Sequence, residues 1–302
     1  CRRILIGTSR GLQLYDKATD TFRNIRFGYN NERNMGAYVS SILKRRNGKI
    51  MIATEGHGLY ELYVQGNNVV IRKPKYRMRA EFINGLYEDK ANNLWIATGD
   101  NGIMSVSQCD VICHYPVNGY NQLIHVGSFF EDSYRNIYIT STDIGIAKLN
   151  ERTKTFMVPE TWKDRIPVFS ICQIGHRQLY IGTIGHGIMT YDIRTGAISD
   201  SQIKFNTFNF AKSEIHTMLK DVYHNLWIGV YGTGVVLLPR ESGQFKYIGH
   251  KSINNDKIGS NRIISIFKDK TSSLWLGTAN DGLYQVSSNG STRHYIPTRG
   301  GV

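Results

Sequence analysis

The 302-residue sequence has no apolar run of the roughly 20 residues that a membrane-spanning helix requires, so none is predicted. It also lacks the paired CxxC or HxxxH spacings of a zinc site. Its four cysteines are Cys1, Cys109, Cys113 and Cys172. Cys109 and Cys113 stand at the spacing of a short hairpin, where they could form a disulfide or serve as small strand residues. We predict neither a metal site nor a cofactor.

Motifs of catalysis are missing as well. The sequence contains no Gly-x-Ser-x-Gly elbow and no His-Glu-x-x-His helix. It has no phosphate-binding Gly-Lys-Ser or Gly-Lys-Thr loop either. Glycoside hydrolysis would need two carboxylates held a few ångströms apart, and nothing in the sequence pairs any two acids in this way. We therefore predict no catalytic residue and expect a binding domain instead of an enzyme.

Acidic residues are few relative to basic ones. The 37 Lys and Arg against 24 Asp and Glu give a net charge of +13. Such a field attracts polyanions such as nucleic acid, acidic glycans or an anionic membrane. The basic residues are scattered, however, and their longest run is Lys44-Arg45-Arg46. A general cationic surface that aids solubility explains this equally well, and we expect no nucleic-acid partner.

A short apolar string recurs along the whole chain at intervals of 42 to 48 residues. Each copy reads apolar-x-apolar-small and ends in Thr, Ser or Val. The seven copies cover residues 4–8, 50–54, 94–98, 137–141, 179–183, 226–230 and 274–278. This period is typical of propeller blades and exceeds that of leucine-rich or ankyrin repeats.

Each period contains four strand signals, as in a four-stranded antiparallel blade. A β-rich first strand is followed by a turn with Asp, such as Asp89, and then by the apolar string as second strand. A hairpin rich in Gly, such as Gly56-His57-Gly58, leads to the third strand, because tight hairpins require positive φ. The fourth strand is weaker and more polar. The turn acids recur as part of the repeat, which favours turn capping over catalysis.

The sequence therefore predicts one all-β domain over 1–302, a seven-bladed β-propeller. The blades are expected at about 1–37, 38–81, 82–122, 123–166, 167–213, 214–261 and 262–302. Only six first strands precede the seven second strands, so one inner strand is missing. We expect it just beyond Val302 or just before Cys1 in a longer polypeptide, and seven repeats divided between two rings are an alternative.

The repeat resembles the two-component regulator propeller repeat. The resemblance rests on Asp89-Lys-Ala-Asn-Asn-Leu-Trp-Ile-Ala-Thr98, Asp221-Val-Tyr-His-Asn-Leu-Trp-Ile-Gly-Val230 and Asp269-Lys-Thr-Ser-Ser-Leu-Trp-Leu-Gly-Thr278. The other four repeats depart from the Trp. The resemblance implies the periplasmic sensor region of a hybrid histidine kinase anchored in the inner membrane. It further implies that this region binds a glycan or serves as the ring or dimer platform for signal transduction, with a second propeller and a β-sandwich in the same polypeptide and a homodimer.

Candidate ligand-binding residues lie in the loops between second and third strands and in the segments leading into first strands. We expect both sets on one face, where His, Asn, Asp, Arg and Tyr side chains could hydrogen-bond sugar hydroxyls or carboxylates. The first set includes Arg10, His57, Asp100, Asn101, Asp143, His186, Tyr231 and Asp281. The second set includes Arg33, Asn34, Arg79, Arg165, Lys212 and Arg262.

Single residues of these sets have a simpler interpretation as solvated turn residues. His57 and His186 occupy equivalent turns of the second and fifth blades, too far apart around a ring to share a metal. Trp162 falls outside the repeat in a loop and is predicted as a sugar-stacking or interface residue. The alternatives to a sensor are a propeller lyase or glycoside-active enzyme, and a purely structural propeller that binds other proteins.

Overall fold

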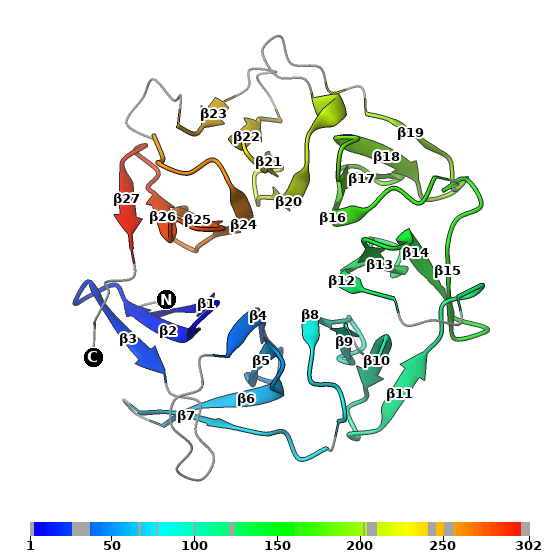
Figure 1. Cartoon of the computed structure of the whole chain (residues 1–302), viewed down its shortest axis with the longest axis horizontal. Coiled ribbons are helices and arrows are strands. Elements are labelled where there is room, and N and C mark those ends of the chain that lie inside the picture. The colour runs from blue at the N-terminus through cyan, green and yellow to red at the C-terminus, as the bar shows by residue number, and fades with distance from the viewer. Residues whose placement is uncertain are drawn as a thin grey trace. The chain divides into compact units, whose positions relative to one another are not determined.

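The computed structural model describes residues 3–25, 37–65, 68–76, 78–99, 101–120, 124–162, 164–201, 203, 210–240, 246–250 and 257–296. These residues form 27 strands and one 3₁₀ turn, η1 (Phe210–Lys212). The strands make seven antiparallel sheets, each from strands consecutive in the chain (Figure 1). The sheets are the blades of a seven-bladed β-propeller, so the predicted fold class is confirmed. None of the described helical residues forms a segment suited to crossing a bilayer.

The first of two compact units, Cys1–Pro159, contains four blades. The first blade consists of β1 (Arg3–Thr8), β2 (Gly11–Asp16) and β3 (Thr21–Ile25). The second consists of β4 (Tyr38–Lys44), β5 (Ile50–Glu55), β6 (Gly58–Gln65) and β7 (Asn68–Arg72). The third consists of β8 (Ile83–Glu88), β9 (Leu94–Thr98), β10 (Ile103–Val106) and β11 (Ile112–Tyr115). The fourth consists of β12 (Val126–Glu131), β13 (Ile137–Ser141), β14 (Gly145–Asn150) and β15 (Thr155–Met157).

The second unit, Glu160–Val302, contains three blades. The fifth blade consists of β16 (Val168–Gln173), β17 (Gln178–Thr183), β18 (Ile188–Asp192) and β19 (Ile198–Asp200). The sixth consists of β20 (Ile215–Lys220), β21 (Leu226–Val230), β22 (Gly234–Leu238) and β23 (Lys246–Ile248). The seventh consists of β24 (Ile263–Lys268), β25 (Leu274–Thr278), β26 (Leu283–Val286) and β27 (Thr292–Tyr295).

The first blade has three strands among the residues that the structure describes, as the strand count of the sequence predicts. β1 is the apolar string that every other blade uses as its second strand, and it pairs with β2 from Arg3–Asp16 to Thr8–Gly11. It also contacts β4, the first strand of the next blade. The source of a fourth strand for this blade stays a prediction.

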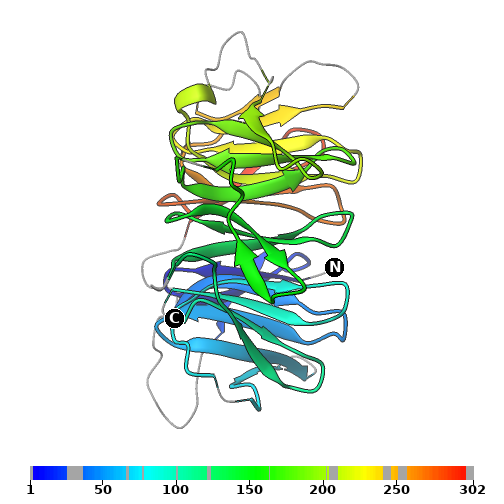
Figure 2. The same ribbon diagram turned by 90° about the vertical axis from the view of Figure 1, so that its right-hand side faces the viewer.

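The core of each unit lies between neighbouring blades. The second strands β9 and β13 are buried at all five positions. Between the second and third blades, Met51 and Ile83 pack in one cluster. Between the fifth and sixth, Cys172 packs with Ile215 in another. Apolar residues on both faces of the second strand are buried because a neighbouring blade packs on each face. In each unit the strands run between two sets of loops (Figure 2).

The hairpins between second and third strands depend on glycine for two reasons. Gly185 and Gly187 have φ of 78° and 65°, a region that side chains with a Cβ rarely adopt. A Cβ on Gly187 would also lie 1.9 Å from the carbonyl oxygen of Phe210, whereas one on Gly185 would meet no atom within 4 Å. The second glycine therefore allows the neighbouring backbone to approach, and the first serves only the turn.

The Asp turn between first and second strands is a hydrogen-bonded unit. In the fourth blade, Oδ1 of the buried Asp132 accepts the backbone N–H of Tyr134 (2.8 Å) and of Asn136 (2.9 Å). Its Oδ2 accepts the Asn136 amide (2.7 Å) and the Tyr138 hydroxyl (3.0 Å). Where a Trp replaces Tyr138, its indole makes the same bond, as from Trp95 to Asp89 at 2.8 Å. The predicted capping role is confirmed, and the Trp contributes a hydrogen bond in addition to packing.

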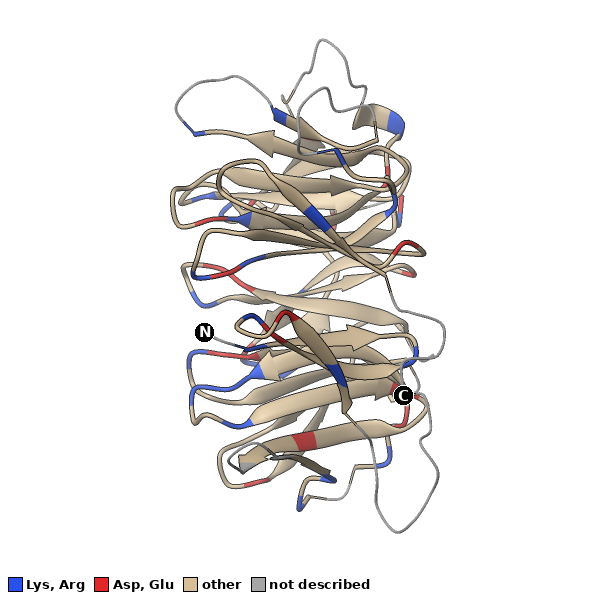
Figure 3. Cartoon of the chain, turned by 90° about the vertical axis from the view of Figure 1, so that its left-hand side faces the viewer, with Lys and Arg blue, Asp and Glu red and all other residues tan. Residues whose placement is uncertain are grey.

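Charged side chains near these turns link one blade to the next. The Arg45 guanidinium lies 2.8 Å from Glu88, and both side chains are less than a tenth exposed. Arg46 donates to the Asp89 carbonyl at 2.7 Å. Two residues of the longest basic run are therefore structural contacts between the second and third blades. Elsewhere Lys and Arg are interspersed with Asp and Glu on the strands and loops (Figure 3).

Candidate functional site

Backbone hydrogen bonds join the two sets of loops that carry the predicted candidates. In the third blade, Gly99 donates to the Phe82 carbonyl (2.9 Å), and in the fifth, Ile184 donates to that of Pro167 (3.0 Å). Tyr231 donates to the Glu214 carbonyl (2.9 Å) in the sixth blade. Each bond ties the loop after a second strand to the segment leading into a first strand. We call the surface that these loops form in each unit the hairpin face.

The first strands carry a β-bulge where they meet the hairpin face. The pairing register of all six shifts just after the first residue or two, for example between Val168 and Ser170 in β16. A bulge leaves its extra residue unpaired and re-aims the side chain. The extra residues are Ser40, Asn84, Gly127 with Ser128, Phe169, His216 and Ile264. Each of these six blades therefore has a bulge residue at the same place in its first strand, but the type of side chain there differs from blade to blade.

In the second unit, the bulge residues Phe169 and His216 and the loop residue Tyr231 form a row of rings, in which the first contact is tilted by 36° and the second is stacked. The rings of Phe169 and His216 have centroids 4.3 Å apart, and those of His216 and Tyr231 are 4.6 Å apart with an interplanar angle of 16°. The Arg262 guanidinium carbon lies 5.8 Å from the centroid of the Tyr231 ring. We call Phe169, His216, Tyr231 and Arg262 the aromatic ladder. It extends across the fifth, sixth and seventh blades.

A carboxylate completes this site. Glu214 Oε2 lies 3.3 Å from His216 Nε2, and the two side chains are 43% and 18% exposed. The backbone bond from Tyr231 to Glu214 holds the Tyr231 turn against the segment that carries this acid. The site therefore offers solvent a ring stack, a guanidinium and a carboxylate. Such a set can pack against a sugar ring and hydrogen-bond its hydroxyls.

The corresponding part of the first unit is polar. Asn84 Nδ2 donates to the Val126 carbonyl (2.8 Å) and lies 3.3 Å from His125 Nε2. The exposed Asp143, a predicted candidate, accepts the backbone N–H of His125 at 2.6 Å. Asp143 thereby fixes the segment that leads into β12. Its other carboxylate oxygen lies 3.5 Å from the Thr142 hydroxyl.

Asp281, another predicted candidate, is held by hydrogen bonds within the seventh blade. Its carboxylate accepts the Tyr284 hydroxyl, and its carbonyl oxygen lies 2.6 Å from His294 Nε2. The Tyr284 and His294 rings stack with centroids 4.0 Å apart. Burial, together with the bond to Asp281, raises the pKa of Tyr284 to about 12. Asp281 thus orders its own blade and is not part of the aromatic ladder.

The remaining predicted candidates are not part of the aromatic ladder. Arg10, Arg165 and His186 are exposed, and His57 is half-buried, with its carbonyl oxygen accepting a hydrogen bond from Lys73. Asn101 lines a separate pocket of the third blade.

Three predicted candidates lie outside the described residues. They are Asp100 in the loop set, and Arg33 and Asn34 in the segments leading into first strands.

The sequence pattern predicted Tyr231 and Arg262 but not Phe169, His216 and Glu214. Phe169 and His216 stand in strands, where residues are expected to pack. The signal that could have found them is position, because Ile215-His216-Thr217 aligns with Ile83-Asn84-Gly85 and both place a polar residue inside an apolar strand.

The sugar-stacking expectation for Trp162 is wrong. This side chain is 5% exposed, so it is buried and cannot stack on a sugar.

The disulfide alternative is not realised in the structure. Cys109, in the turn before β11, and Cys113, in β11 itself, are exposed free thiols. Cys172 is buried between the fifth and sixth blades, and burial raises its thiol pKa to about 11.

Comparison with known families matches residues 78–100 to the Two component regulator propeller family. This segment contains the string that begins at Asp89, so the resemblance seen in the sequence is confirmed. A comparison with curated proteins found no match.

Solved structures share the fold at low sequence identity. A domain described as the extracellular domain of a hybrid two component system, BT4673 from B. thetaiotaomicron, has a TM-score of 0.74 at 19% identity, covering 98% of this chain and 37% of that one. Virginiamycin B lyase from Staphylococcus aureus, as a catalytically inactive His-to-Ala variant with quinupristin, has a TM-score of 0.66 at 15% identity. That match covers 90% of this chain and 87% of the lyase. PorZ, a surface component of the type-IX secretion system of Porphyromonas gingivalis, has a TM-score of 0.67 at 16% identity, covering 96% of this chain and 45% of that one.

Proposed function

We propose that this chain, which carries the repeat of the two-component regulator propeller family, is a sensor propeller that binds an oligosaccharide on the aromatic ladder. The chain spans 37% of the length of the BT4673 domain, which is described as extracellular and as part of a hybrid two component system. By analogy, the proposed parent protein is a periplasmic sensor joined to a histidine kinase. A second propeller, a β-sandwich and a homodimer are part of the same proposal, and so is closure of the seven blades into one domain over 1–302.

The aromatic ladder is the observation that carries the proposal. Sugar rings present apolar C–H faces edged by hydroxyls, and they are bound by flat side chains flanked by hydrogen-bonding groups. Phe169, His216 and Tyr231 supply an aromatic surface, with successive ring centroids less than 5 Å apart. Glu214 and Arg262 supply a carboxylate acceptor and guanidinium donors at its border.

An acidic oligosaccharide fits the charge of the site and of the chain. Arg262 is exposed at the end of the ladder, and a guanidinium can bind a carboxylate through two parallel hydrogen bonds, in a bidentate pair. The net charge of +13 adds a long-range attraction for anions. The ladder supplies the short-range selectivity, because stacking does not weaken with salt as the field does.

Signalling from such a site needs a difference in affinity between two states. A ligand shifts the equilibrium only if it binds one arrangement of the sensor more tightly than the other. The ladder draws side chains from three blades, so its spacing depends on how these blades pack. We therefore propose that ligand on the ladder favours one packing of the second unit, which the parent protein reads.

The second candidate function is a lyase. It is favoured by the imidazole–carboxylate pair of His216 and Glu214, since a histidine oriented by an acid can act as a general base. The fold similarity to virginiamycin B lyase is consistent with this alternative. A lyase would release product during incubation, whereas a sensor returns its ligand unchanged.

Both candidates are tested by calorimetric titration of the chain with neutral and acidic oligosaccharides at low and physiological salt. The sensor proposal predicts saturable binding of an acidic oligosaccharide that persists at physiological salt, and an unchanged ligand when the mixture is analysed by mass spectrometry. Product formation that His216→Ala abolishes would establish the lyase instead. If the heat of binding is seen at low salt but not at physiological salt, the binding is a non-specific electrostatic attraction, and this result would contradict the proposal.

A further inference from the structure

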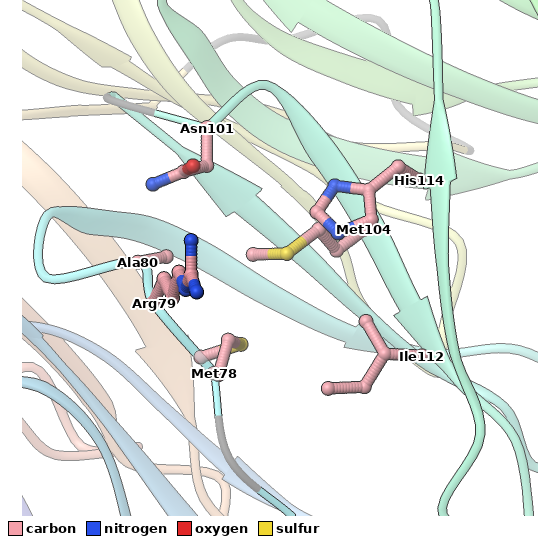
Figure 4. A pocket seen from close by; sticks show the side chains of 7 residues that line it. All are labelled: Met78, Arg79, Ala80, Asn101, Met104, Ile112 and His114. Atoms are coloured by element: carbon pink, nitrogen blue, oxygen red, sulfur yellow. The ribbon is translucent and has the colours of Figure 1, made fainter.

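The third blade contains a pocket of about 410 Å³ that is distinct from the aromatic ladder. Its apolar lining comes from Met78 and Ala80, in the segment leading into β8, from Met104 on β10, and from Ile112 on β11 (Figure 4). Met104 and Ala80 are buried, so this floor is part of the packed blade. The volume lies in the range of small-molecule sites.

Three polar side chains complete the lining. Arg79, Asn101 and His114 surround the apolar floor, each from a different segment of the chain (Figure 4). Within the described part of the chain, none of the three side chains has a hydrogen-bond or ion-pair partner. A guanidinium is always charged and is recognised most strongly by a planar anion. Among the residues that the structure describes, the pocket therefore combines a guanidinium without a counter-ion with an amide and an imidazole above an aliphatic surface.

The chemistry of this lining distinguishes it from a sugar site. Apart from His114, the described residues that line it carry no aromatic ring, and its floor is thioether, methyl and branched aliphatic carbon. Such surfaces gain by covering CH₂ groups, and each one buried strengthens binding roughly three- to fourfold. Arg79 would be matched by a carboxylate, which accepts two parallel N–H bonds.

We propose that this pocket binds a small aliphatic carboxylate. The carboxylate lies against Arg79, with Asn101 and His114 beside it, and the alkyl chain covers Met78 and Met104. Affinity then depends on both parts of the ligand. It rises with chain length until the floor is covered, and it falls when the acid is replaced by a neutral group of the same length.

The test uses the 302-residue chain with ¹³C-labelled methionine methyl groups and sodium hexanoate as the probe. Saturable shifts are expected at the methyls of Met78 and Met104, while Met157 on β15 of the fourth blade serves as an internal control. Butanoate is expected to bind about tenfold more weakly than hexanoate, since it has two fewer CH₂ groups. Hexan-1-ol, which lacks the charge, is expected to bind at least tenfold more weakly.

Arg79→Gln is expected to weaken hexanoate binding at least tenfold, and Arg152→Gln, an exposed arginine in the turn before β15, to leave it unchanged. Unshifted methyl resonances of Met51 and Met189 would show that the Arg79 variant is folded. Three results would overturn the proposal: no saturable shift at millimolar hexanoate, equal binding by the Arg79 variant, or an equal shift at Met157. Each is independent of whether the aromatic ladder binds a glycan.

Discussion

Replacing Asp221 with Asn tests how the Asp turns stabilise the blades. Oδ2 of this buried carboxylate accepts hydrogen bonds from Trp227 (3.1 Å), from the Asn225 side chain (3.1 Å) and from Lys268 of the next blade (2.7 Å). Burial alone would raise the pKa of Asp221, but the bonds from Lys268, Trp227 and Asn225 outweigh it. They lower this pKa from 3.8 to about 2.

The magnitude follows from this difference in pKa. One pKa unit corresponds to about 1.4 kcal/mol, so ionised Asp221 contributes about 2 kcal/mol to the free energy of unfolding at neutral pH. Because the pKa is lower in the folded chain, the contribution is present above pH 3.8 and is lost as the pH falls towards 2. At pH 3 about half of it should remain, on the order of 1 kcal/mol.

The assay is urea unfolding followed by tryptophan fluorescence at pH 7 and pH 3. Asp221→Asn should lower the free energy of unfolding by about 2 kcal/mol at pH 7 and by about half as much at pH 3. Asp164→Asn removes the same charge from an exposed position and should change it by less than about 0.5 kcal/mol. Equal stability of the two variants at pH 7, or the same loss for Asp221→Asn at both pH values, would refute this role of Asp221.

Three further predictions concern the turns and the thiols. Gly187→Ala should lower the free energy of unfolding by about 2 kcal/mol or more, because its Cβ would collide with the Phe210 carbonyl, whereas Gly185→Ala should cost about 1 kcal/mol from backbone strain alone; thermal melts of the pair check this. Trp95→Phe should lower the free energy of unfolding by about 1 to 3 kcal/mol, because it leaves Asp89 without the indole donor. Equal free energies of unfolding in urea for the variant and the unmutated chain would contradict that role. Cys109 and Cys113 should react with a maleimide at pH 8 much faster than Cys172, whose buried thiol has a pKa of about 11; peptide mass spectrometry would disprove this by finding all three labelled at one rate.

The strands were predictable from the sequence because their signal is local and repeated. The string Leu94–Thr98 is apolar at nearly every position, and it is buried throughout as β9 because a blade packs on each of its faces. The turn around Asp89 was predictable for the same reason, since both partners of the carboxylate lie within six residues.

The aromatic ladder was only half predictable, because it depends on contacts between blades. Tyr231 and Arg262 stand in loops, where sequence reasoning looks for ligand contacts. Phe169 and His216 stand in strands, and only the bulges turn their side chains towards the hairpin face. The register shift is set by pairing with β17 and β21, so only a comparison between repeats, such as His216 with Asn84, points to the bulge.

Other differences have the same origin. Trp162 has no repeat partner in the sequence, and its burial results from tertiary packing that a loop assignment does not reveal. Arg45 belongs to a basic run that reads as surface charge, yet its partner Glu88 lies 43 residues away in the next blade.

The central claim is that the aromatic ladder is the ligand site. The most direct test is a calorimetric titration at physiological salt. An acidic oligosaccharide, such as an oligogalacturonate, is titrated into the unmutated chain and into the Tyr231→Ala and Tyr134→Ala variants. Tyr134 is an exposed tyrosine in the Asp turn of the fourth blade, so it controls for the loss of a surface ring. We predict that Tyr231→Ala weakens binding about tenfold or more, while Tyr134→Ala binds with the affinity of the unmutated chain. Equal affinities for all three proteins would contradict the claim.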